Sequence, residues 1–207
     1  VTYRLEGPLP SLPDRAQAWK LGNTPEPDRV AALAAALGLT AKPKQEPTGW
    51  TVHDGRRALV VNRAAGVPWT YGTDLGVCGT RVGGGPYHPG PGIQCLDPNA
   101  PVAGQRTARS DLPSQAEAER IARDLAARAG LDPTGARVRV VDSWSARTVT
   151  IAPAVAATPT SGLSWTVAVG AKGAVQYASG WLATPQPADT YPLIGVQAGF
   201  EQLRKVR

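Results

Sequence analysis

Apolar positions recur with a helical period in two separate stretches of the chain. In residues 24–38, Val30, Leu33 and Leu37 fall on one face, prolines stand in the first turn, and Gly38 follows the last periodic position. This pattern predicts an amphipathic helix of about three turns.

The second helical stretch is residues 112–131. Ile121 and Leu125 mark its apolar face, and Ser114 with Glu117 has the spacing of a capping box, in which each residue satisfies a free backbone N–H at the helix start. A second amphipathic helix is therefore predicted.

After each helical stretch, apolar and polar residues alternate, which is the period of a half-buried strand. Residues 49–72 predict two strands that turn at Asp54-Gly55, followed by an extended piece. Residues 136–182 predict further strands, including a hairpin that turns between Gly170 and Gly173.

The predicted fold class is α+β, with two consecutive units that each pack one helix on an antiparallel sheet. The first unit spans residues 1–105, and the second spans residues 106–207 and ends in a helix. The boundary falls near residues 100–110. A single sheet shared by both halves is the alternative.

Composition and charge narrow the class of protein. The 207 residues are 42% hydrophobic and 18% charged, which is typical of a globular chain that buries a core. The net charge is +6, but the 22 basic residues are scattered and no nucleic-acid-binding motif is present. We therefore expect a solvated basic surface and no nucleic-acid partner.

The two cysteines, Cys78 and Cys95, bracket a loop rich in glycine and proline, CGTRVGGGPYHPGPGIQC. This placement predicts a disulfide that staples the loop 78–95, with two free thiols as the alternative. Closing such a loop contributes about 3 kcal/mol by the chain-entropy estimate. A disulfide favours an exported protein.

We expect no signal peptide within these residues, and no apolar run reaches the ~20 residues that span a membrane. We expect an extracytoplasmic domain, either secreted or tethered through an N-terminal anchor that lies outside this sequence. Membrane contact is expected only through such an anchor.

Catalytic and ligand-binding motifs are weak throughout. The glycines of the cysteine loop lack the lysine and the following helix of a phosphate-binding loop, and its prolines remove amide donors. His53 and His88 lack convergent partners for a metal or a catalytic triad. A cysteine nucleophile paired with His88 is the one enzymatic alternative. We expect no catalytic residue, no metal and no cofactor.

Aromatic and basic residues gather around the cysteine loop. They are Trp69, Tyr71, Arg81, Tyr87 and His88. Aromatic residues and arginine dominate protein-contact patches, so these five are the candidate partner-binding residues. The alternative is that Trp69 and Tyr71 pack beneath the loop.

Three segments between residues 110 and 203 carry a resemblance to a known family: SQAEAERIARDLAARAGL, SWTVAVGAKGAVQYASGWL and YPLIGVQAGFEQL. Their order resembles the PepSY-type and wider cystatin-like modules found outside the cytoplasmic membrane of Gram-positive bacteria. The whole chain also resembles lipoproteins and secreted proteins of actinobacteria. The resemblance implies a regulatory or inhibitory binding module.

The expected function is a non-enzymatic binding or regulatory module of the bacterial cell envelope, which contacts a protein or a cell-wall component. A protease inhibitor or propeptide-like module is the alternative, and an enzyme is the less favoured one.

The disulfide gives the first testable prediction. Alkylation of the native, unreduced protein should leave its mass unchanged, because Cys78 and Cys95 are joined, while alkylation after reduction should add two groups. Two alkylated thiols in the native protein would contradict both the disulfide and the export that it supports.

Overall fold

The chain divides into two compact units, which are described separately. The terminal unit combines Val1–Leu21 with Pro185–Arg207, and the sheet unit is Gly22–Thr184. The computed structural model describes residues 4, 6–9, 11, 13–73, 111–143, 145–155, 158–159 and 161–205.

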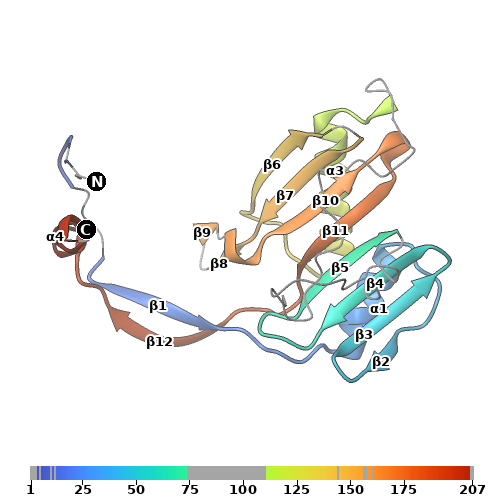
Figure 1. Ribbon diagram of the computed structural model, residues 1–207, viewed down its shortest axis with the longest axis horizontal. Helices are drawn as coiled ribbons and strands as arrows, with labels where there is room; N and C mark the ends of the chain where they lie inside the picture. The colour runs from blue at the N-terminus through green and yellow to red at the C-terminus, as the bar shows by residue number, and fades with distance from the viewer. Residues whose placement is uncertain are drawn as a thin grey trace, which may run out of the picture. The chain divides into compact units, whose positions relative to one another are not determined.

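Eight antiparallel strands of the sheet unit form one continuous sheet, in the order β2-β3-β4-β5-β11-β10-β7-β6 (Figure 1). The strands are β2 (Lys44–Glu46), β3 (Gly49–Asp54), β4 (Arg57–Asn62), β5 (Pro68–Thr73), β6 (Arg137–Asp142), β7 (Arg147–Ala152), β10 (Trp165–Val169) and β11 (Val175–Trp181). A short separate pair is made by β8 (Ala154–Val155) and β9 (Thr158–Pro159).

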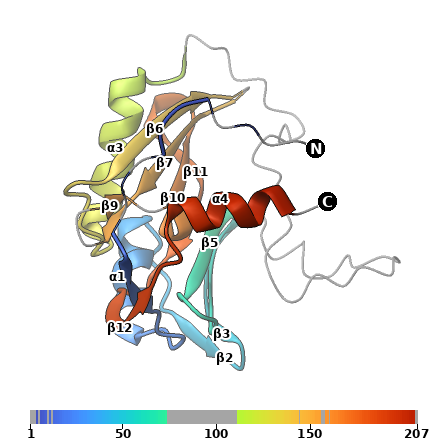
Figure 2. The same cartoon turned by 90° about the vertical axis from the view of Figure 1, so that its left-hand side faces the viewer.

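Two helices, α1 (Pro27–Ala36) and α3 (Gln115–Arg128), cover one face of this sheet (Figure 2). Both were predicted from the period of their apolar residues. The Ser114 hydroxyl accepts a hydrogen bond from the Glu117 backbone N–H at 3.1 Å, so this part of the predicted capping box is confirmed.

The core lies between the helices and the covered face of the sheet. Alternate residues of each strand point into it, as the period of two requires. The fully buried side chains include Val30, Leu33, Leu125, Val52, Leu59, Val61, Trp69, Val149, Ile151, Trp165, Val167 and Val169.

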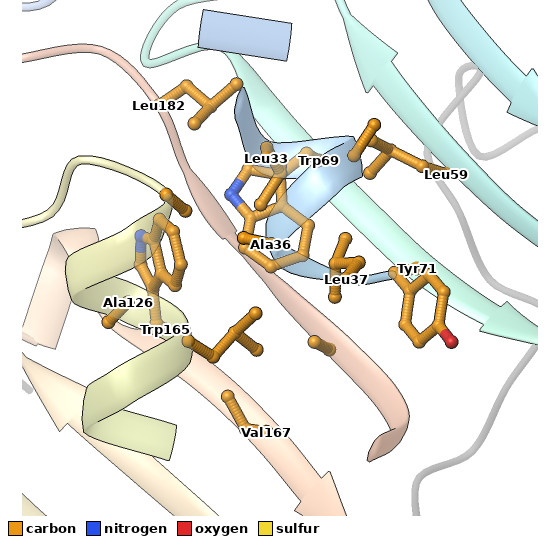
Figure 3. Packing of buried hydrophobic residues seen from close by; sticks show 14 of the residues in the cluster. Leu33, Ala36, Leu37, Leu59, Trp69, Tyr71, Ala126, Trp165, Val167 and Leu182 are labelled. Atoms are coloured by element: carbon orange, nitrogen blue, oxygen red, sulfur yellow. The ribbon is translucent and has the colours of Figure 1, made fainter. Parts of the chain in front are cut away.

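The middle of the sheet is the pairing of β5 with β11, which sets Trp69 opposite Gly180. Trp165 lies over this glycine, because a Cβ added at Gly180 would come within 2.5 Å of the indole Cδ1. The rings of Trp69 and Trp165 meet edge-on, with centroids 4.8 Å apart. Figure 3 shows Trp69 beside α1 and Trp165 beside α3, so one aromatic pair joins both halves of the core.

The predicted fold class, two consecutive helix-on-sheet units, is wrong. The described chain is mostly antiparallel sheet, in one eight-stranded sheet and two two-stranded pairs, with three α-helices. The reason is that β5 from the first half pairs with β11 from the second, instead of each strand ending a separate sheet. Alternation of side chains shows which face of a strand is buried, but it does not show which edges pair.

The terminal unit pairs β1 (Arg15–Lys20) with β12 (Gln186–Pro192) as an antiparallel ribbon, and α4 (Val196–Lys205) follows. The final helix was predicted as the end of a second unit made from residues 106–207. It belongs instead with strands from both ends of the chain.

Part of the sequence prediction falls on residues 74–110, outside the described residues. The loop 78–95 with Cys78 and Cys95 lies there, and so does the boundary between residues 1–105 and 106–207. No disulfide occurs among the residues that the structure describes, and both features stay predictions.

Replacement of Gly180 by alanine tests the aromatic junction. The new methyl group would displace the Trp165 indole, and overpacking of this kind costs about 1–3 kcal/mol of unfolding free energy. Gly22→Ala is the matched control, since a Cβ at Gly22 meets nothing within 4 Å. Equal chemical denaturation midpoints for the two variants would contradict the junction.

Candidate protein-contact surfaces

Two of the predicted partner-binding residues lie in the core. Trp69 is 1% exposed and Tyr71 is 4% exposed, both on the helix-covered side of β5. The other three, Arg81, Tyr87 and His88, lie outside the described residues, and their contact with a partner stays a prediction. The structure places both side chains in the hydrophobic core, and whether the cysteine loop covers them lies outside the described residues.

Several ionisable groups of the described chain form ion pairs. On α3, Arg120 donates to Glu117 at 2.8 Å and this hydrogen bond lowers the pKa of the Glu117 carboxyl; Arg123 donates to Glu119 at 2.8 Å. Within the described ranges, no group of three or more His, Cys, Asp or Glu residues could hold a metal ion. These pairs at helical spacing stabilise α3.

Asp54, at the β3–β4 turn, ties that turn to the loop that follows α1. Its Oδ2 accepts hydrogen bonds from the Thr40 backbone N–H at 3.0 Å, from the Thr40 hydroxyl at 3.1 Å and from Arg57 at 3.1 Å. The Thr40 backbone hydrogen bond is the largest cause of the lowered pKa of this carboxyl. The group is thus a structural clasp.

Exposed apolar side chains gather in the terminal unit, where β12 leads into α4. We call this set the terminal apolar surface: Tyr191 (55% exposed), Leu193 (44%), Ile194 (63%) and Leu203 (42%). Only one other large hydrophobic residue of the described chain, Val141, is as exposed. A concentration of this kind is typical of an interaction site.

Helix α4 continues the terminal apolar surface. Val196, Phe200 and Leu203 follow the spacing of one helical stripe, and Ile194 reaches the same stripe, since its Cδ1 lies 3.8 Å from a Cβ built at Gly199. On the polar side of α4, Glu201 accepts a hydrogen bond from Arg204 at 3.4 Å. The helix is amphipathic, and none of its residues is buried.

The described part of the terminal unit contributes no residue to the buried core. A two-stranded ribbon is marginally stable in water. Isolated helices of fewer than ~12–15 residues are also marginally stable, and α4 has ten. The ribbon and the helix therefore need an apolar contact to supply most of their stability.

The sequence held a signal for this surface. Helical spacing in residues 196–203 predicts α4. The apolar run YPLIGV, residues 191–196, leads into it and is too short to form a buried helix by itself. What the pattern did not show is that no residue of α4 is buried by the described part of the chain.

One edge of the large sheet is a second candidate surface. Strand β6 ends the strand order, and on its uncovered side it carries Arg137, Arg139 and Val141. Val138 and Val140, on the other side, pack against the core. The strand is thus anchored by one face and open at its edge.

Comparisons with protein-family models, with curated proteins and with solved structures found no match to this chain. The resemblance to PepSY-type modules stays a prediction. None of the helices in the described ranges is both long enough and apolar enough to cross a membrane.

The Asp54 clasp predicts a pH dependence of stability. Because the folded-state pKa is lowered, the ionised carboxylate stabilises the fold above the unfolded pKa of about 3.9, and this contribution is lost as the pH falls through the folded value. The difference in unfolding free energy between wild type and Asp54→Asn should be largest near neutral pH and shrink below pH ~4.

Thr40→Ala is the control for this experiment, because it removes the hydroxyl donor and keeps the backbone donor. It should destabilise the protein less than Asp54→Asn in urea titrations. A difference between wild type and Asp54→Asn that is constant from neutral to acid pH would contradict the clasp.

Proposed function

We propose that this protein is a non-enzymatic binding or regulatory module of the bacterial cell envelope, outside the cytoplasmic membrane, and that it contacts a protein partner through the terminal apolar surface. The observation that carries the proposal is the exposure of Tyr191, Leu193, Ile194 and Leu203 in a unit whose described residues contribute nothing to the core.

The chemistry of the terminal apolar surface favours a protein partner over a cell-wall polysaccharide. Leu193, Ile194 and Leu203 present aliphatic groups, which gain free energy when another apolar surface removes them from water. A polysaccharide offers mainly hydroxyl groups and would leave these side chains poorly matched. An apolar groove on a protein accepts an amphipathic helix such as α4.

Two further points support the proposal, one for the role and one for the location. The described carboxylates of α3 pair with arginines at the surface, and Asp142 lies 3.4 Å from the largely buried Arg147, which suits a structural role for these groups. The location in the envelope rests on the predicted Cys78–Cys95 disulfide and on the resemblance to extracytoplasmic modules.

Site-specific photo-cross-linking tests the proposal. A photoreactive residue at Ile194, in the full chain produced in its own bacterium, should give a discrete protein adduct that the same residue at Ala127 does not give. Ala127 is the control because it is exposed on α3, away from the terminal unit in sequence.

Leu193→Ser combined with Leu203→Ser should reduce the adduct at Ile194 by at least tenfold, while the denaturation midpoint of the sheet unit stays the same, because both side chains are exposed. Equal adducts at Ile194 and Ala127, or none at either position, would contradict the proposed contact.

A further inference from the structure

We propose a second contact surface, independent of the terminal apolar surface: the free edge of β6 binds an extended acidic segment of a partner protein, which adds a ninth strand to the sheet. Addition of a strand to an open edge is a common mode of peptide recognition. Three features of β6 argue for it: its free backbone, the charge on its uncovered side, and the poor fit of a second copy.

The backbone of β6 is available along one side. All of its strand pairing is with β7, from Arg137 opposite Ala152 to Asp142 opposite Arg147. Among the described residues, no other backbone hydrogen bond reaches Arg137–Asp142. Six residues at ~3.3 Å each leave alternate N–H and C=O groups free over about 20 Å.

The opposite edge of the sheet is much less suitable. Strand β2 has only three residues, and two of them, Lys44 and Glu46, form an ion pair at 2.9 Å. Short edge strands with charged side chains are a common protection against pairing. The two edges therefore differ, and β6 is the one with room for a peptide.

The charge on β6 defines the partner. Arg137 and Arg139 are exposed, two residues apart, and neither makes an ion pair or side-chain hydrogen bond with another described residue. Beside them, on the same face, β7 offers Thr148 and Thr150, which are uncharged. Carboxylates at alternate positions of an added strand would lie directly opposite the two guanidinium groups.

Val141 extends the pattern by one position. It is 45% exposed on the same side of β6 as the two arginines. An antiparallel added strand would therefore carry an apolar residue opposite Val141, then acidic residues opposite Arg139 and Arg137, each separated by one residue. This gives the partner a sequence pattern of apolar-x-acidic-x-acidic.

A second copy of this chain fits the same edge poorly. Antiparallel pairing of two β6 strands with the uncovered faces on one side sets arginine opposite arginine when it is centred on Val138 or on Arg139. Like charges directly opposite destabilise a strand pair. The net charge of +6 also favours an acidic partner over a second copy.

Peptide binding to the purified full chain tests the proposal. The probe is a short capped peptide of valine and threonine with glutamates at two alternate positions, and its binding is followed by fluorescence anisotropy. It should bind saturably and shift amide NMR signals of β6 and β7 but not those of β2. A peptide with lysines in place of the glutamates should not bind.

Charge reversal at Arg137→Glu and Arg139→Glu should weaken binding of the glutamate peptide at least tenfold and create binding of the lysine peptide, which also shows that the variant is folded. Lys42→Glu with Arg63→Glu is the control, since it changes the net charge equally at exposed positions away from β6. Two further peptides carry N-methyl groups on the odd-numbered or on the even-numbered backbone nitrogens. The peptide whose methylated nitrogens face β6 should not bind, and the other should bind.

Several results would overturn the proposal. Equal weakening of binding by the control pair would indicate a general charge effect. Binding of both N-methylated peptides would show that the backbone of β6 is not used. NMR shifts confined to β2, or dimerisation of the chain through β6 in sedimentation experiments, would also contradict it. Loss of the terminal contact at Leu193 and Leu203 leaves all expected results for β6 unchanged, so the two surfaces are tested separately.

Discussion

Gly180 leaves room on β11 for the indole of Trp165, which meets the indole of Trp69 edge-on across the line where β5 and β11 pair. Trp165 also donates a hydrogen bond to the Trp181 carbonyl oxygen at 2.9 Å, which fixes its orientation. Without the pairing of β5 with β11 each half would expose an unpaired strand edge, and without the ring contact each half would expose one face of its tryptophan. The continuous sheet, its helix-covered core and the position of its free edges all depend on this junction.

Local structure in this chain could be predicted from local pattern, and long-range pairing could not. The apolar period around Leu33 and Leu125 correctly predicted α1 and α3, because helix formation depends on residues three and four apart. Strands β5 and β11 are more than a hundred residues apart in sequence, and the alternation in each of them fits a sheet edge as well as a sheet centre. The same limit hid the pairing of β1 with β12.

The candidate sites show the same division. The residue type of Trp69 and Tyr71 and their place beside the cysteine loop fit a contact site as well as packing, and the structure puts both on the covered face of β5. The apolar stripe of α4 was visible in the sequence, but only the structure shows that Ile194 and Leu203 are exposed among the described residues. The free edge at Arg137 and Arg139 follows from strand order, which no local pattern contains.

A single shared core has a direct experimental signature. Native-state hydrogen exchange of amides in β4 and β10, measured at increasing denaturant, reports the opening free energy of each half of the sheet. If the aromatic junction makes one cooperative unit, the slowest amides of both strands should merge into one unfolding isotherm with one dependence on denaturant. Two separate isotherms, one for β4 and one for β10, would contradict the account.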